Sequence, residues 1–265
     1  MFGALSPARR RLLLALAVLV IVVGVALAVL AFTGRRDTAS APQDQPGPVL
    51  LVPGYGGSTT ALSSLASRLR AEGRRATIVT LPDSGVGDLA GQAKALDAAV
   101  RADLNSTGAP SVDVIGYSAG GVVARLWARD DGGAARARRI VTLGSPHHGT
   151  DVAAVGEAVP GACPAACQEL APDSDLLSRL NAGDETPAGP EWVSIWTTVD
   201  EVVVPPDSAR LAGATNIEVQ GVCQGSTVAH GQLPTDPAVQ RMVLAELGTG
   251  PVRGFSASDC ARFSS

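Results

Sequence analysis

Gly116-Tyr117-Ser118-Ala119-Gly120 is the stretch of sequence that decides the fold. An apolar run over residues 112–115 precedes it, and a helix-like segment over residues 121–127 follows it. Between a strand and a helix, a G-x-S-x-G pentapeptide forms a sharp turn that presents the serine hydroxyl above the sheet. The glycines on either side let the strand and the helix pack closely around this turn. Ser118 is therefore predicted to be a nucleophile, provided that the rest of the chain supplies its partners.

A nucleophilic serine needs a general base, and histidine is the usual one. The chain has three histidines, His147, His148 and His230. His230 lies in a loop between a strand-like run at 215–220 and a helix expected over 236–247. We interpret His230 as the base rather than as a solvated loop residue. The loop that contains His147 and His148 follows the strand expected at 139–143 and is predicted to line the cleft, with the two histidines either structural or next to the substrate. No metal site is predicted there, because the pair has no further ligands at suitable spacing.

The group that orients the base is predicted to be Asp200, two residues beyond a strand-like run at 191–198. Functional groups of open parallel sheets gather at the carboxyl ends of strands. The alternatives are Glu201, Asp207 and Asp151. Neighbouring residues of an extended chain point in opposite directions, so only one of Asp200 and Glu201 can face the histidine. A role for Asp200 limited to capping the turn stays open.

The negative charge that develops during attack on a carbonyl needs preorganised N–H donors. One is predicted to be the amide of Ala119, directly after the nucleophile. The other is predicted to be the amide of Tyr55, in the glycine-rich loop 53–58 after the strand at 48–52. This loop contains neither G-K-[ST] nor G-x-G-x-x-G, so it does not predict nucleotide binding.

These features occur together as five motifs in order, namely Val52-Pro53-Gly54-Tyr55-Gly56-Gly57, residues 116–121, Leu143-Gly144-Ser145-Pro146-His147-His148-Gly149-Thr150, Asp200-Glu201-Val202-Val203-Val204-Pro205-Pro206 and His230. Over residues 46–260 the chain resembles the small secreted lipases and esterases of the α/β-hydrolase superfamily, closest to the actinobacterial class 2 triacylglycerol lipases. The resemblance implies hydrolysis of carboxylic esters of acyl chains by a Ser-His-Asp triad, without a cofactor.

The chain departs from the pattern of this family at two positions. Many relatives have histidine where this chain has Pro53, and histidine where it has Tyr117. Neither position carries a proton in the mechanism, so the departures concern the substrate. A thioesterase or acyltransferase with the same triad is an alternative. A non-catalytic lipid-binding module is a third hypothesis.

The composition, 46% hydrophobic with a formal charge of −4, fits one globular core. No basic patch predicts nucleic-acid binding, and the arginines at 136–139 are interpreted as a solvated turn. Strands are expected near 48–52, 75–81, 112–116, 139–143, 192–198 and 215–220, and helices near 59–72, 88–104, 119–130 and 236–247. This alternation predicts an α/β-hydrolase fold with a mostly parallel sheet of about six strands and helices on both faces. The segment 151–190 is expected to form a wall of the acyl site, and the protein to be a monomer.

Residues 1–47 differ from the rest in composition. Arginines occupy positions 9–11, and residues 12–32 carry no charge. As a helix this run would be about 32 Å long, which matches the hydrocarbon core of a bilayer. We therefore expect a tail and transmembrane anchor at 1–33, a linker at 34–47 and a catalytic domain at 48–265 outside the cell membrane. Cleavage as a signal peptide, with release of the domain, is the alternative.

The four cysteines are consistent with an oxidising compartment. Four cysteines allow three pairings. We favour Cys163–Cys167, which would clip the segment after the histidine pair, and Cys223–Cys260, which would tie the tail to the loop of His230. The spacing of Cys163 and Cys167 does not match a C-x-x-C redox motif.

Overall fold

The structure is a computed structural model that describes residues 9, 11, 13–14, 16–18, 20–24 and 41–264. Six parallel strands form one sheet in the order β2-β1-β3-β4-β5-β6. The strands are β1 (Val49–Val52), β2 (Ala76–Ile78), β3 (Val112–Tyr117), β4 (Ala137–Leu143), β5 (Glu191–Trp196) and β6 (Thr215–Glu218). The described helices are α2 (Thr60–Ala71), α3 (Leu89–Thr107), α4 (Ala119–Asp130), α5 (Asp151–Glu157), α6 (Ala165–Glu169), α7 (Asp175–Leu180), α8 (Val219–Val222), α9 (Pro237–Glu246) and α10 (Cys260–Ser264).

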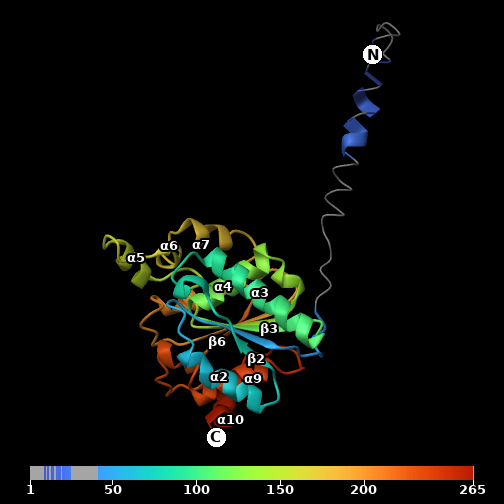
Figure 1. Ribbon diagram of the computed structural model, residues 1–265. Coiled ribbons are helices and arrows are strands. Elements are labelled where there is room, and N and C mark those ends of the chain that lie inside the picture. Colours follow the sequence, from blue (N-terminus) through green and yellow to red (C-terminus); the bar gives the residue numbers. More distant parts are fainter. Residues whose placement is uncertain are drawn as a thin grey trace. The chain divides into compact units, whose positions relative to one another are not determined.

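Helices cover both faces of this sheet, with α3 and α4 on one side and α2 and α9 on the other (Figure 1). The central strands β1, β3, β4 and β5 are almost wholly buried, because both faces of the sheet are covered there, whereas the edge strands β2 and β6 are only partly buried. In β1, Leu50 and Val52 join the core beneath α3 and α4, whereas Val49 and Leu51 join the core beneath α2 and α9. This division follows from the alternation of side chains along a strand.

The predicted strands and long helices are present, with shorter bounds in three strands. β2 ends at Ile78 rather than 81, and β5 ends at Trp196 rather than 198. β6 ends at Glu218, and α8 replaces the end of the strand predicted to reach residue 220. Gln220 of α8 connects this turn to the chain after β5. Its side chain accepts the N–H of Thr198 and donates to Thr197 Oγ1.

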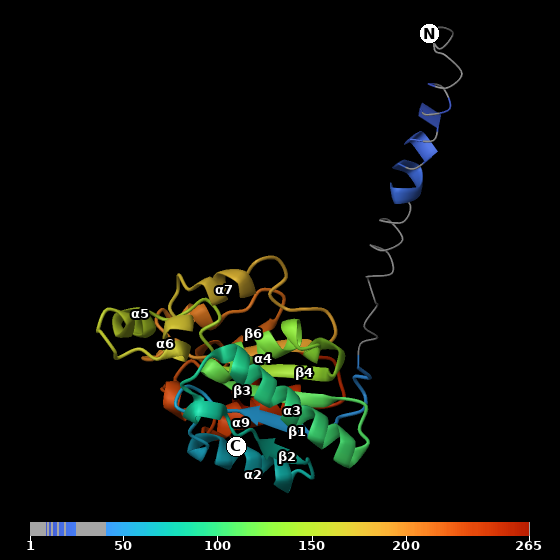
Figure 2. The same ribbon diagram turned by 45° about the horizontal axis from the view of Figure 1, so that its top comes forward.

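The segment after the histidine pair contains three short helices, α5, α6 and α7, which the sequence did not predict. Figures 1 and 2 show them together along one side of the molecule. A disulfide joins Cys163 to Cys167 in this segment, and a second joins Cys223 to Cys260 at α10. Both are the pairings that the sequence favoured.

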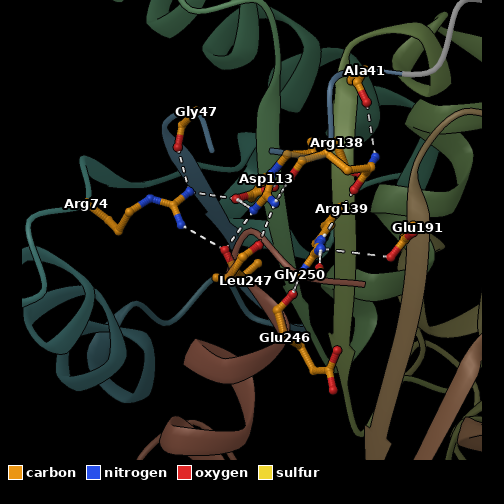
Figure 3. Close-up of polar contacts among 12 residues, drawn as sticks. Ala41, Gly47, Arg74, Asp113, Arg138, Arg139, Glu191, Glu246, Leu247 and Gly250 are labelled. Atoms are coloured by element: carbon orange, nitrogen blue, oxygen red, sulfur yellow. Dashed lines mark hydrogen bonds and ion pairs between the residues drawn. The ribbon is translucent and has the colours of Figure 1, made fainter. Parts of the chain in front are cut away.

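At the amino end of the strands, an ion-pair cluster contradicts the expectation of a solvated turn at 136–139. Arg138 and Arg139 lie within β4, and both side chains are buried. The guanidinium of Arg138 donates to both carboxylate oxygens of Asp113, at 2.9 and 2.6 Å, and Arg74 donates to the same carboxylate at 2.6 Å. Figure 3 shows these side chains converging, with Arg139 directed toward the backbone carbonyl of Glu246 and the side chain of Glu191. The buried carboxylate is therefore paired twice, as burial of a charge requires.

Arg138 and Arg74 also join residues 43–47 to residues 247–248 at the end of α9. Arg138 donates to the carbonyls of Gln43, Leu247 and Gly248, and Arg74 donates to Gly47 O. Residues 41–47, within the predicted linker, are thus in contact with the body. The chain divides into two compact units, Met1–Thr38 and Ala39–Ser265. Among the described residues no helix is long and apolar enough to span a membrane. The predicted anchor at 1–33 lies largely outside those residues.

Candidate active site

Ser118 occupies the turn between β3 and α4. Its backbone has φ 53° and ψ −127°, a left-handed conformation that is strained for a residue with a side chain. The neighbouring glycines are needed for steric reasons. A Cβ atom at Gly116 would lie 2.5 Å from Gly121 Cα, and one at Gly120 would lie 2.3 Å from Val52 O. The strand and helix therefore approach more closely than any other residue would permit.

The structure brings Ser118, His230 and Asp200 into one hydrogen-bonded row. Ser118 Oγ lies 3.1 Å from His230 Nε2, and His230 Nδ1 lies 2.8 Å from Asp200 Oδ2. The other oxygen of Asp200 accepts the N–H groups of Val202 and Val203, at 2.9 and 2.8 Å. These bonds hold the carboxylate in place, so that one oxygen faces the imidazole. All three side chains are buried, at 8%, 4% and 7% exposure respectively.

The competing acids lie elsewhere. Glu201 is exposed, and its carboxylate accepts the backbone N–H of His230 at 3.4 Å rather than a ring N–H. Asp151 is exposed in the first turn of α5, and Asp207 is exposed beyond the loop after β5. Among these four acids, which all lie in the described part of the chain, only Asp200 forms a hydrogen bond with the imidazole ring.

Gly144 lies directly beneath the Asp200–His230 pair. Its φ is +51°, and a Cβ atom there would lie 3.2 Å from both Asp200 Oδ2 and His230 Nδ1. The same atom would lie 2.6 Å from Leu233 Cδ1. Sequence reasoning had grouped Gly144 with the histidine-pair loop and had assigned it no role. Gly144 directly follows β4, and β4 is the neighbour of β5, the strand that leads to Asp200. This position could have indicated that Gly144 lies close to Asp200.

Tyr117, the residue before Ser118, contacts His230. Its hydroxyl donates to the carbonyl of His230 at 3.4 Å, and the two ring centroids are 5.3 Å apart. Burial, followed by the negative charges of Asp200 and Glu201, raises the pKa of Tyr117 to about 12. The phenol is therefore neutral at physiological pH and can keep donating. In the sequence, Tyr117 was visible only as a departure from the family pattern, and no motif indicated its contact with His230.

The glycine-rich loop lies against the nucleophile. A Cβ atom at Gly54 would lie 2.9 Å from Ser118 Cβ, so the backbone leading to Tyr55 passes next to the serine. The Gly57 N–H donates to Gly54 O at 3.0 Å, and the Gly56 N–H donates to Gly85 O at 3.4 Å. The loop is thus supported by residues 82–85.

Two residues of this supporting segment, Asp83 and Ser84, have positive φ values of 48° and 53°. Gly85 follows with φ 70°, and a Cβ atom there would lie 2.6 Å from Gly57 N. Left-handed conformations of non-glycine residues tend to occur at functional sites. This supporting turn was missed by sequence reasoning, since neither Asp83 nor Ser84 has a pattern that requires positive φ.

The two histidines of the 143–150 loop have different surroundings. His147 is fully buried, with Nε2 3.1 Å from Thr142 Oγ1. Burial, together with the adjacent charge of Arg125, lowers its pKa well below the ordinary value. It therefore stays neutral and has the structural role of the two that the sequence allowed, whereas Pro146 and Thr150 of the same loop line the cavity. His148 is more exposed, and its Nε2 lies 3.0 Å from Glu185 Oε1. In the described part of the chain, no group of three or more His, Cys, Asp or Glu residues could hold a metal ion.

A cavity of about 260 Å³ opens beside Ser118 and is mostly apolar. Its wall comes from the loop after β1, the segment 146–170 and the residues after Asp200. The lining residues are Tyr55, Ser118, Pro146, Thr150, Val152, Ala153, Ala162, Cys167, Leu170, Val202 and Val203. The segment 151–190 contributes five of these, as expected from the sequence. The cavity can therefore hold an apolar group next to the serine hydroxyl.

Several solved structures share this fold. Lipase B from Aspergillus fumigatus superposes with a TM-score of 0.68 at 18% identity, over 81% of this chain and 56% of that chain. The mature form of lipase BlEst2 from Bacillus licheniformis gives 0.64 at 19% identity, over 77% and 93%. The esterase EaEST from Exiguobacterium antarcticum gives 0.56 at 14% identity, over 77% and 92%. At such low identity these likenesses show the fold alone.

The chain spans little more than half the length of the fungal lipase, whose activity is therefore no direct guide to this protein. No curated protein matches the chain in sequence. The sequence profile of the family described as Lipase (class 2) matches residues 93–242, which include Ser118, Asp200 and His230. Since this match extends over more than half of the sequence, the chain belongs to the class 2 lipase family.

Proposed function

We propose that the protein hydrolyses carboxylic esters of acyl chains through an acyl-enzyme on Ser118. The observation that carries the proposal is the hydrogen-bonded row from Ser118 Oγ through His230 to Asp200. A serine with a strained backbone, a histidine within hydrogen-bond reach and an oriented carboxylate are the three parts that nucleophilic catalysis by serine requires.

In the first half-reaction, His230 Nε2 takes the proton of Ser118 as the hydroxyl oxygen attacks the ester carbonyl. Asp200 accepts the Nδ1–H of His230, which fixes the tautomer and stabilises the imidazolium that forms. When the tetrahedral intermediate collapses, the C–O bond to the alcohol breaks and His230 gives its proton to the leaving oxygen. An acyl group is then bonded to Ser118.

In the second half-reaction, water replaces the alcohol. His230 removes a proton from the water molecule as it attacks the acyl carbonyl. Collapse of the second intermediate returns the proton to Ser118 and releases the carboxylic acid. In both steps the N–H groups of Ala119 and Tyr55 are proposed to bind the oxyanion. The position of Gly54 against Ser118 Cβ supports the role of Tyr55, because it brings that backbone close to the nucleophile.

The apolar cavity supports an acyl chain as the group next to the carbonyl. Its volume of 260 Å³ equals that of about nine water molecules at about 30 Å³ each. A short or medium acyl chain fits such a space, whereas a long chain would extend beyond it. We therefore propose short- to medium-chain esters, such as those of glycerol, as substrates.

Replacement of the nucleophile tests this function. Ser118→Ala should lower kcat/KM for nitrophenyl butyrate by about four or more orders of magnitude, and it should abolish labelling by a fluorophosphonate probe. Ser145→Ala is the matched control, because Ser145 is also buried and its hydroxyl has no hydrogen bond in the described structure. It should keep activity and labelling. Unchanged hydrolysis in the Ser118 variant would contradict the proposal, and ester products formed with added butanol would indicate acyl transfer.

We also propose that residues 1–33 anchor the protein in the cell membrane, with the catalytic domain on the outside. The uncharged run at 12–32 and the two disulfides support this placement. Membrane fractionation followed by protease treatment of intact cells tests it. Retention of the full-length chain in the membrane, with a digestible outer domain, is expected. Release of a shortened chain into the medium would show that the segment is a cleaved signal.

A further inference from the structure

Asp200 is carried by residues 198–204, here called the acid turn, which belong to no helix or strand. A buried N–H group needs a hydrogen-bond acceptor, and outside regular structure the acceptor is often a side chain. In the acid turn, the N–H groups at positions 198, 199, 202, 203 and 204 all donate to side-chain oxygens. The place of Asp200 relative to His230 therefore depends on the side chains that supply these oxygens.

One of these side chains lies outside the turn, at the end of the histidine-pair loop. Asp200 Oδ1 accepts the N–H groups of Val202 and Val203, so the carboxylate is fixed only as firmly as this backbone. Thr150 holds the backbone on either side of Val203. Its hydroxyl donates to Val202 O at 2.6 Å and accepts the N–H of Val204 at 3.0 Å.

Thr150 is itself held in place. It is buried, and its N–H donates to Leu170 O at 3.0 Å. The N–H of the next residue, Asp151, donates to Val204 O at 2.8 Å, which is a further bond to the acid turn. The hydroxyl also accepts the N–H of Val152 at 3.3 Å, at the start of α5. A hydroxyl has one hydrogen and two lone pairs, so these bonds use its whole capacity. The branch at Cβ restricts rotation of the side chain.

We propose that Thr150 is a positioning residue, whose hydroxyl holds the acid turn so that the Asp200 carboxylate meets the imidazole of His230. The connection runs from Thr150 Oγ1 through the backbone of residues 202–204 to Asp200 Oδ1. It leaves Asp200 Oδ2 at 2.8 Å from His230 Nδ1. Thr150 acts through the carboxylate and transfers no proton. This inference rests on the proposed function, because the carboxylate matters to catalysis only if His230 is the base.

Removal of the hydroxyl at nearly constant shape tests the inference in the full-length protein. Thr150→Val keeps the outline of a side chain that lines the cavity, but Val202 O and Val204 N–H lose their partner. The kcat for nitrophenyl butyrate should fall about 10- to 100-fold, because the carboxylate is no longer held in its productive place. The KM should change by less than about threefold, since the cavity wall is kept. Thr150→Ser restores the hydroxyl and should keep kcat within about fivefold of the parent value.

A second background separates positioning from a general effect on the structure. In Asp200→Asn, Thr150→Val should lower kcat by less than about a further twofold, because the group through which the hydroxyl acts is already gone. These rates are measured above the residual rate of Ser118→Ala.

Thr142→Val is the matched control. Thr142 is also buried, and its hydroxyl is hydrogen-bonded to His147 and Ser194 instead of to the acid turn. This variant should lower Tm, because it too loses buried hydrogen bonds, but it should keep kcat within about threefold.

Four results would overturn the proposal. They are an unchanged kcat in Thr150→Val, an equal loss in Thr150→Ser and Thr150→Val, an equal loss in Thr142→Val and Thr150→Val, and the same loss with and without the Asp200 carboxylate. Circular dichroism shows whether each variant is folded. If Thr150→Val does not fold, Thr150→Ser decides alone, and a folded serine variant with less than about a tenth of the parent kcat would contradict the proposal. The proposed function fails separately, if Ser118→Ala keeps hydrolysis. When Ser118→Ala loses hydrolysis and Thr150→Val does not, only the positioning role is wrong.

Discussion

Replacement of Gly144 by alanine is expected to disable the catalytic pair without removing any functional group. The new Cβ would lie 3.2 Å from both Asp200 Oδ2 and His230 Nδ1, and 2.6 Å from Leu233 Cδ1. The last distance is shorter than any real Cβ contact, so Leu233 or the backbone of residue 144 must move. The two 3.2 Å approaches are also tighter than ordinary contacts, so Asp200 or His230 must shift by a few tenths of an ångström, which alters the 2.8 Å contact that orients the imidazole.

The magnitude has two parts. Alanine at φ +51° costs about 1–2 kcal/mol of stability, because its Cβ crowds the backbone in the left-handed region. That loss lowers Tm by about 2–8 °C in a domain of this size. Displacement of the catalytic pair by several tenths of an ångström should lower kcat/KM by about 10- to 100-fold.

Gly73→Ala separates the two parts. Gly73 has φ +78°, and a Cβ atom there has nothing within 4 Å. The control variant therefore carries the backbone strain but no contact with the catalytic pair. Thermal denaturation and nitrophenyl butyrate kinetics are measured on both variants. If Gly144→Ala keeps kcat/KM within about twofold of Gly73→Ala, the steric reasoning about the pair is wrong.

Three further predictions address the acid, a buried carboxyl and the cavity. Asp200→Asn should lower kcat by about 10⁴-fold, whereas Glu201→Gln should have little effect; similar losses in both kinetic assays would contradict the assignment. Burial raises the pKa of Glu246 to about 7, so the folded state binds more protons than the unfolded state between pH 4.5 and 7, and stability falls as pH rises through this window. Glu246→Gln should raise Tm more at pH 8 than at pH 5, and an equal change at both pH values would refute this. Ala153→Phe should lower kcat/KM for a nitrophenyl octanoate at least about tenfold relative to the acetate, and an unaltered ratio in a chain-length series would exclude this cavity as the acyl site.

The order of the functional residues was accessible from sequence because of a general property of parallel sheets. The carboxyl ends of parallel strands meet at one edge, so Ser118 after β3 and Asp200 after β5 had to lie near each other. Side-chain alternation implied that only one of Asp200 and Glu201 could face the histidine, and the observed contacts place Asp200 at the imidazole. His230 was identified by its place in the chain rather than by any local pattern.

Other features depend on tertiary contacts and have no local signal. The left-handed turn at Asp83 and Ser84 is held by packing against Gly57, which lies far away in sequence. Helices α5 to α7 are too short for a hydrophobic period to be recognised. The arginines at 136–139 looked like a solvated turn, because a row of charges is normally exposed. Arg138 can be buried because Asp113, on the neighbouring strand, supplies the counter-charge, and this pairing is not visible in the local sequence.

Strand register connects the ion pair at the amino end of the strands with the proposed catalytic residues at the carboxyl end. β3 begins near Asp113 and ends just before Ser118, while β4 begins near Arg138 and ends just before Gly144. In the observed register, Tyr117 pairs with Leu143, and the Ser118 N–H donates to Leu143 O. A slip of one residue between the strands would turn every side chain of one strand to the opposite face. It would separate Arg138 from Asp113 and leave the buried guanidinium of Arg138 without its counter-charge, at a cost of about 3–5 kcal/mol. The Arg138–Asp113 pair therefore favours the observed register. In this register Ser118 lies beside Gly144, and Gly144 lies against the Asp200–His230 pair.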